Sequence, residues 1–146
     1  MDRARALELL KSGPEGVQRW NRWRARHDEL PDLSRAVLQG LDLSGADLSG
    51  LCLAHANLRG ARLDAANLAS ATLTHANLSK ASLQNTDLRS AVLAHANLHG
   101  AELFGADLRS TNLESARLEG ASADERTRWP AGFHPARRGV DLWPAG

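Results

Sequence analysis

One apolar position recurs at a fixed interval through most of the chain. A leucine stands at every fifth position from Leu33 to Leu118, eighteen in succession. The position two residues before each leucine is small or apolar in nearly every unit, and the residue directly before it is often Asp or Asn. A period of five fits neither an α-helix nor a plain strand. The chain is therefore predicted to turn a corner within each A-(D/N)-L-x-x unit, with the leucine and the alanine pointing inward.

Self-similarity at a fixed period indicates a solenoid. The units resemble those of the pentapeptide repeat family, whose members form a right-handed parallel β-helix of square cross-section with four repeats in each twenty-residue coil. The resemblance covers residues 31–122, about two thirds of the chain. It implies an all-β, quadrilateral solenoid of about 4.5 coils, which at the spacing between β-strands would be about 22 Å long. The fold alone does not fix the function of such a solenoid.

The second residue after each leucine is predicted to lie at a corner of the coil. A type II turn requires positive φ at this position and favours Gly or Asn. Eight of the units have one of these residues there: Gly40, Gly45, Gly50, Gly60, Asn85, Gly100, Gly105 and Gly120. The corners that hold Arg35, Ala65, Ser70 or Lys80 are expected to use other turn types.

Two short helices are expected before the repeats, in residues 2–12 and 15–28. In the second helix one arc is apolar or aromatic and holds Val17, Trp20, Trp23 and His27. Another arc is basic and holds Arg19, Arg22 and Arg26. Because a β-helix must protect its terminal edge, residues 1–30 are predicted to form a helical cap in which Trp20 and Trp23 cover the first coil. The alternative is that the arginines bind phosphate, an acidic partner or a membrane surface.

The tail, residues 123–146, has a density of aromatic residues and prolines that the repeats lack, and we predict an irregular C-terminal cap. Residues 127–133 read TRWPAGF and resemble the Trp-Pro-x-Gly-Phe closing segment of many pentapeptide repeat proteins, which assigns Trp129 and Phe133 to the cap. Phe104 breaks the polar pattern of the outward positions. It is either covered by the tail or an interaction hot spot.

Aligning the repeats with a period of twenty places the outward residues in columns. The most regular corner column is His55, His75 and His95, whose imidazoles are expected about 4.8 Å apart. Neighbouring rings at this spacing could share a transition metal or form a pH-sensitive strip. The alternative is that histidine tolerates the corner backbone and recurs by duplication of a twenty-residue unit. No Asp, Glu or Cys completes a ligand set in this column, and no metal site is assigned.

A second column holds Asp47, Asn67, Asp87 and Asp107, and Arg89 and Arg109 follow on the same face. One hypothesis is an anionic strip that faces a basic partner. The alternative is an ordinary solvated ladder, in which Asp and Asn form hydrogen bonds with the neighbouring coil and the arginines neutralise the charge.

Composition limits the remaining classes of function. The 146 residues have a net charge of +1, distributed as +2 over residues 1–30, −2 over 31–122 and +1 over 123–146. We therefore expect neither direct nucleic-acid binding nor a strongly acidic mimic of nucleic acid. The single cysteine, Cys52, excludes an intrachain disulfide and favours a reducing compartment, and no apolar run is long enough to span a membrane. These features predict a bacterial-type, cytoplasmic protein.

Motifs of catalysis are lacking: the sequence has no nucleophile elbow, phosphate loop or HExxH motif, and a filled solenoid offers no concave pocket. The favoured hypothesis is a non-catalytic structural or protein-interaction module without a cofactor, a monomer or weak dimer that docks an unidentified protein through a flat face.

The family resemblance implies an alternative, since some members mimic duplex DNA and bind a type II topoisomerase (gyrase), protecting it from quinolones or inhibiting it. Those mimics are long acidic dimers, whereas this rod is short and nearly neutral. A metal-binding or pH-sensing histidine column is the third hypothesis.

Overall fold

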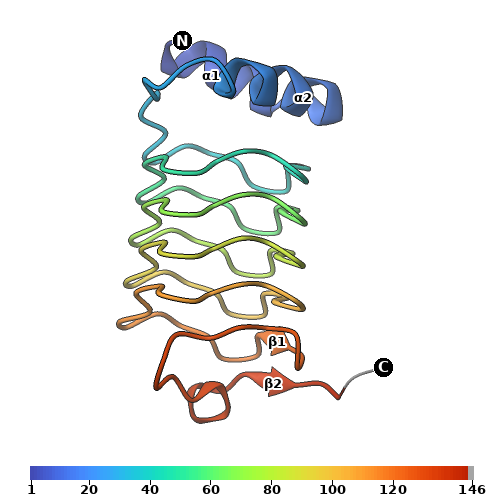
Figure 1. The fold of residues 1–146 in the computed structure, drawn as a ribbon, viewed down its shortest axis with the longest axis vertical. Helices are drawn as coiled ribbons and strands as arrows, with labels where there is room; N and C mark the ends of the chain where they lie inside the picture. Colours follow the sequence, from blue (N-terminus) through green and yellow to red (C-terminus); the bar gives the residue numbers. More distant parts are fainter. Residues whose placement is uncertain (145–146) are drawn as a thin grey trace.

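The computed structural model describes residues 1–144 and has two helices at one end of an elongated stack of coils (Figure 1). The elements in chain order are helix α1 (Arg3–Leu10), helix α2 (Gly13–Arg24), strand β1 (Ser122–Ala123), the 3₁₀ helix η1 (Pro135–Arg138) and strand β2 (Asp141–Leu142). Between α2 and β1 the chain winds around the long axis, so the helices and β2 lie at opposite ends of the stack (Figure 1).

Parallel bridges join the coils at intervals of twenty residues. One column of bridges joins Val37, Asn57, Asn77, Asn97 and Arg117 in succession. Each bridge uses the residue before a leucine: Leu38 N donates to Asn57 O at 2.8 Å, and Asn57 N donates to Ala36 O at 2.9 Å. Corners every five residues leave only this short segment of each side free to pair, which is why the sides are bridges rather than long strands. The chain is a parallel β-helix, as the resemblance to the pentapeptide repeat family implies.

The interior is filled by the leucines and the alanines of the repeat. Every central leucine from Leu33 to Leu108 is fully buried, and Leu113 and Leu118 are nearly so. Two threonines take inward alanine positions. Thr86 Oγ1 donates to Leu63 O at 2.7 Å and Thr111 Oγ1 donates to Leu108 O at 2.7 Å, so that neither buried hydroxyl is left unsatisfied.

All corners adopt the same backbone conformation. The second residue after every leucine has φ between 57° and 74°, including Arg35, Ala65, Ser70 and Lys80. The expectation that these four corners use other turn types was therefore wrong. The reason is the register between coils: Ala65 N donates to Gln84 O at 2.9 Å, as Gly45 N donates to Asp64 O at 2.9 Å. The stabilisation from this hydrogen bond between coils outweighs the conformational strain of about 1–2 kcal/mol that a residue other than glycine has at positive φ.

The two helices differ from their expected bounds. The side chain of Asp2 accepts a hydrogen bond from Arg5 N at 2.8 Å and begins α1, as predicted. Residues 13 and 14, which lie between the two expected helices, open α2, because proline is tolerated in the first turn of a helix. α2 ends at Arg24 rather than at residue 28. No helix within residues 1–144 is long and apolar enough to cross a membrane.

The tail closes against the last coil. β2 pairs in parallel with β1, with Ser122 opposite Asp141. The final bridge, from Asp107 to Arg128, spans twenty-one residues instead of twenty. The extra residue places Thr127 inward, where it is buried and its Oγ1 donates to Leu103 O at 2.8 Å.

Candidate interaction surfaces

Two bidentate ion pairs lie on the face that carries the aspartate column. Arg89 Nε and Nη2 donate to Oδ1 and Oδ2 of Asp87 at 2.9 and 2.7 Å. Arg109 Nε and Nη2 donate to Oδ1 and Oδ2 of Asp107 at 2.9 and 2.6 Å. The side chain of Arg89 is 54% exposed and that of Asp87 28%, so the positively charged groups are the outer ones. The hydrogen bond from its arginine holds the pKa of each carboxyl below the ordinary value.

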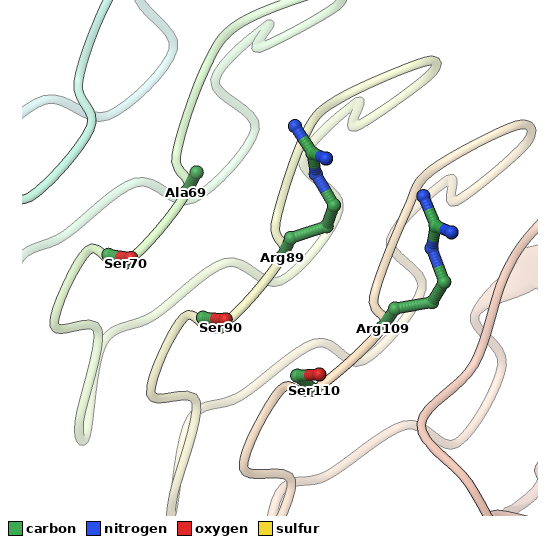
Figure 2. A pocket seen from close by; sticks show the side chains of 6 residues that line it. All are labelled: Ala69, Ser70, Arg89, Ser90, Arg109 and Ser110. Atoms are coloured by element: carbon green, nitrogen blue, oxygen red, sulfur yellow. The ribbon is translucent and has the colours of Figure 1, made fainter.

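An open groove of about 440 Å³ runs beside these arginines. We call it the Arg–Ser groove, and it is lined by Ala69, Ser70, Arg89, Ser90, Arg109 and Ser110. Figure 2 shows the two arginines side by side and pointing the same way, with the three serines in a second row. This row of hydroxyls was not predicted from the sequence, because the corner at Ser70 was expected to have a different turn type.

The histidine column forms a stack of parallel rings. The ring centroids of His55 and His75 are 4.9 Å apart with an interplanar angle of 9°, and those of His75 and His95 are 4.8 Å apart with an angle of 8°. All three side chains are exposed. Parallel rings do not converge on one ion, and within residues 1–144 no group of three or more His, Cys, Asp or Glu side chains could hold a metal.

The second helix contacts the first coil through three side chains. Trp20 is fully buried and its Nε1 donates to Asp47 O at 2.8 Å. Asn21 Oδ1 accepts from Asp47 N at 2.8 Å, and its Nδ2 donates to Gly45 O at 3.0 Å. Arg24 Nη2 donates to Ser49 O at 2.7 Å and Ser49 Oγ at 2.8 Å. Arg24 Nη2 also lies 3.4 Å from Asp47 Oδ1, so the carboxylate of Asp47, whose side chain is 39% exposed, is paired with a cation of the helix.

The electrostatics of Asp47 follow from these contacts. Partial burial raises the pKa of its carboxyl, but hydrogen bonds from Ser49 and the charge of Arg24 outweigh burial and leave the pKa below the ordinary value. Asn21 and Arg24 were not among the residues singled out from the sequence. On a helical wheel Arg24 lies within the apolar arc, between Trp20 and Val17, so an arginine on the face toward the coil was a signal that could have found it, whereas Asn21 lies outside both arcs. The basic arc of Arg19, Arg22 and Arg26 is exposed.

Trp23 is half-buried, and its ring centroid lies 5.4 Å from that of Trp20.

At the opposite end, Trp129 stacks on Phe133 at 5.0 Å, and the guanidinium of Arg138 lies 5.3 Å from the centre of the Phe133 ring. Phe104 is half-buried and meets Trp143 edge-on at 5.8 Å, so the tail covers part of this ring. Trp143 itself is 58% exposed.

A leucine-filled stack of twenty-residue coils joined by parallel bridges defines a β-helical solenoid. The family model of pentapeptide repeats matches residues 32–64, 52–89 and 86–124, with 8 copies of its unit. The chain belongs to the pentapeptide repeat family, whose fold is a right-handed β-helix. No match to a curated protein sequence was found.

Solved structures of the same family are similar to this chain. A pentapeptide repeat protein from the thylakoid lumen of Arabidopsis thaliana is 35% identical with a TM-score of 0.61, over 62% of this chain and 63% of that protein. The protein Rfr23 of the cyanobacterium Cyanothece 51142 is 36% identical with a TM-score of 0.58, over 71% of this chain and 67% of its own. The chain thus spans less than two thirds of the length of the Arabidopsis protein.

Proposed function

We propose that the chain is a non-catalytic interaction module that docks a partner protein against a rigid, flat face. The observation that carries this proposal is the uniformity of the coils. All corners share one φ range and the leucines from Leu33 to Leu108 are fully buried. Outward side chains in successive coils therefore stand in fixed rows. Side chains that are already ordered lose little entropy when a partner binds.

The proposed module has three parts. Residues 31–122 are the binding solenoid, and the bridges at intervals of twenty residues support the expected 4.5 coils. Residues 1–30 serve as the N-terminal cap, with Trp20 and Trp23 over the first coil. Residues 123–146 serve as the C-terminal cap, with Trp129 and Phe133; residues 145 and 146 lie outside the described part.

Mimicry of DNA toward a type II topoisomerase remains the alternative, and the charge distribution gives it little support. A mimic needs a continuous row of carboxylates along one face. Here the column has Asn67 between Asp47 and Asp87, and it ends at Arg128. Arg89 and Arg109 form ion pairs with Asp87 and Asp107. The side chains of the arginines are more exposed than those of the aspartates. The face therefore presents mixed charge, which favours a general interaction module.

The stacked imidazoles support a third candidate, a metal- or pH-responsive edge. Two neighbouring rings would have to rotate out of the parallel stack to share one ion. NMR spectra of the imidazole protons recorded with added Zn²⁺ test this idea. Selective broadening of His55, His75 and His95 at micromolar Zn²⁺ would support it, and broadening only at a large excess would exclude it.

The single half-buried cysteine, Cys52, is compatible with the predicted cytoplasmic location. That location stays a prediction, since one structural relative comes from a thylakoid lumen. The oligomeric state, a monomer or weak dimer, also stays a prediction.

Capture of a partner by face-specific variants tests the proposed function. Wild-type protein is immobilised beside two variants, Arg89→Glu with Arg109→Glu on the Asp–Arg face and Arg59→Glu with Arg117→Glu on the opposite face. Both pairs change the net charge equally, and thermal melting checks their folding. If a protein is retained by the wild type and by one variant but is lost by the other, this supports docking through the face that is altered in the variant that loses it. Absence of any partner, or equal retention by all three, contradicts it. Inhibition of DNA supercoiling by purified gyrase would favour mimicry instead.

A further inference from the structure

The Arg–Ser groove combines guanidinium and hydroxyl donors in an open space that no carboxylate lines, among the residues described. We propose that this groove binds a phosphate monoester, with Arg89, Arg109, Ser90 and Ser110 as hydrogen-bond donors. The site goes beyond the proposed docking function and does not depend on it.

The arginines have donors to spare. A guanidinium has five N–H groups, and the bidentate bonds of Arg89 to Asp87 use two of them. Arg109 is bound to Asp107 by the same two nitrogens. Within residues 1–144, neither Nη1 atom forms a hydrogen bond, and the outer edges of both groups remain open to a ligand. Because the aspartates already fix the arginine side chains, ligand binding costs little additional side-chain entropy.

The hydroxyl row is similarly available. Ser90 and Ser110 are exposed corner residues with φ of 62° and 63°. Neither hydroxyl forms a hydrogen bond to another group in the described part of the chain. The fixed corner backbone gives both serines the same position in their coils, so the hydroxyls repeat with the arginines (Figure 2).

The spacing between successive coils suits a tetrahedral oxyanion that bridges the two arginines. Successive coils are separated by about 4.8 Å. A phosphate that accepts charge-assisted hydrogen bonds of about 2.8 Å on two different oxygens can bridge donors one coil apart. Arg89 Nε lies 3.9 Å from Asp107 Oδ2, which links the two ion pairs and keeps the two guanidinium groups in adjacent coils together. One phosphate group can therefore contact both coils.

The charge around the groove limits the affinity but favours an anion at the outer edge. Asp87 and Asp107 balance the two arginines, so the pairs together are neutral. The carboxylates are on the inner side: the side chain of Asp107 is 21% exposed and that of Arg109 51%. An incoming anion meets the guanidinium edges first. We expect a dissociation constant of about 1 mM for a small phosphate monoester, corresponding to a few hydrogen bonds at an exposed site.

Chemical-shift titration tests this site. O-phospho-L-serine is added to ¹⁵N-labelled wild-type protein, and backbone amides and arginine Nε groups are followed. The expected result is saturable shifts at Ser90, Ser110, Arg89 and Arg109, with unphosphorylated serine producing none. No saturable shift in the millimolar range, or shifts spread over all arginines, would overturn the proposal.

Two variants and a matched control separate a site from general charge attraction. Arg89→Gln with Arg109→Gln should weaken binding at least about tenfold, because two charge-assisted donors are lost. Arg59→Gln with Arg117→Gln removes the same charge from the opposite face and should leave binding unchanged; equal weakening in both would overturn the proposal. If the first variant does not fold, Ser90→Ala with Ser110→Ala decides, since it leaves the ion pairs intact and should weaken binding several-fold. Unchanged affinity in the serine variant would then overturn the assignment.

Two further titrants identify the source of the phosphate. Inorganic phosphate represents a free anion, and a short phosphoserine peptide represents a phosphorylated protein. Tighter binding of the peptide assigns the site to protein-borne phosphate, and equal or tighter binding of inorganic phosphate assigns it to a small molecule. Failure of both to bind contradicts the site.

Discussion

Asn21 supplies to Asp47 the backbone partner that a preceding coil would otherwise provide. Its Oδ1 accepts from Asp47 N at 2.8 Å, whereas one coil later Asn67 N donates to Ala46 O at 2.9 Å. The other side-chain bonds of α2 act in the same way, since Trp20 Nε1 donates to Asp47 O at 2.8 Å. The helix thereby satisfies backbone groups of an edge that would otherwise be open to pairing with another chain.

Replacing Asn21 by Ala should destabilise the protein by about 1–3 kcal/mol, because Asp47 N and Gly45 O lose their partners in a partly buried site. Urea unfolding measures the change. Arg22→Ala is the control, since this exposed side chain on the same helix should alter the free energy of unfolding by less than about 0.5 kcal/mol. Equal effects of the two substitutions would show that the Asn21 contacts do not stabilise the edge.

Leu73→Ala should destabilise the protein by about 2–5 kcal/mol, because coils held in register above and below cannot collapse into the cavity. Leu73 is fully buried. The neighbouring Thr74→Ala alters an outward side chain and serves as the control. The denaturant midpoint of Leu73→Ala should fall well below that of Thr74→Ala; coincident midpoints would contradict the inward position of the leucine.

Glycine at a corner should stabilise the protein where glycine elsewhere destabilises it. Ala65 has φ of 58°, so Ala65→Gly should stabilise the folded state by relieving about 1–2 kcal/mol of left-handed strain. The greater entropy of glycine in the unfolded chain offsets about 0.5–1 kcal/mol of this gain. The net effect should be a higher melting temperature. Ala54, which lies outside the positive-φ residues, is the matched control, and Ala54→Gly should lower the melting temperature. Shifts of the same sign in both variants would refute the argument from strain.

Stability should decrease in acid through the two Asp–Arg pairs. Hydrogen bonds from Arg89 and Arg109 lower the pKa of Asp87 and Asp107 from 3.8. A carboxyl with a lowered folded-state pKa contributes stability above its unfolded pKa and loses it as pH falls through the folded value. Urea unfolding from neutral pH to below about pH 3 should therefore show a steeper loss in the wild type than in Asp87→Asn with Asp107→Asn. Parallel pH profiles would indicate that the pairs contribute nothing to acid stability.

The fold could be predicted from the sequence because one signal repeats eighteen times. The leucine register fixes the inward positions and the columns, and the stacked rings of His55, His75 and His95 lie where that register places them. The corners were predicted less well, because the preference of a turn for Gly or Asn takes no account of the hydrogen bonds between coils. At Ala65 those bonds impose the left-handed conformation, which alanine by itself disfavours.

The contacts at the ends could not be predicted in the same way. Asn21 and Arg24 bind backbone atoms of the first coil, and these partners become apparent only once α2 is docked. The Arg–Ser groove also depends on tertiary structure, because its serines and arginines come from three successive coils. Periodicity predicts that such residues share a face, but not which donors remain free.

The twenty-residue bridge interval also determines how the faces respond to insertions and deletions. Loss of one whole coil would shorten the rod by about 4.8 Å and leave every later residue on its original face. Loss of a single five-residue unit would instead rotate all later side chains by a quarter turn about the axis, with the leucine core intact. If the deleted unit lies between the two arginines, Arg109 would leave the side of Arg89, although the fold and composition would hardly change. The length of an insertion or deletion, more than its sequence, would thus decide whether a surface site survives.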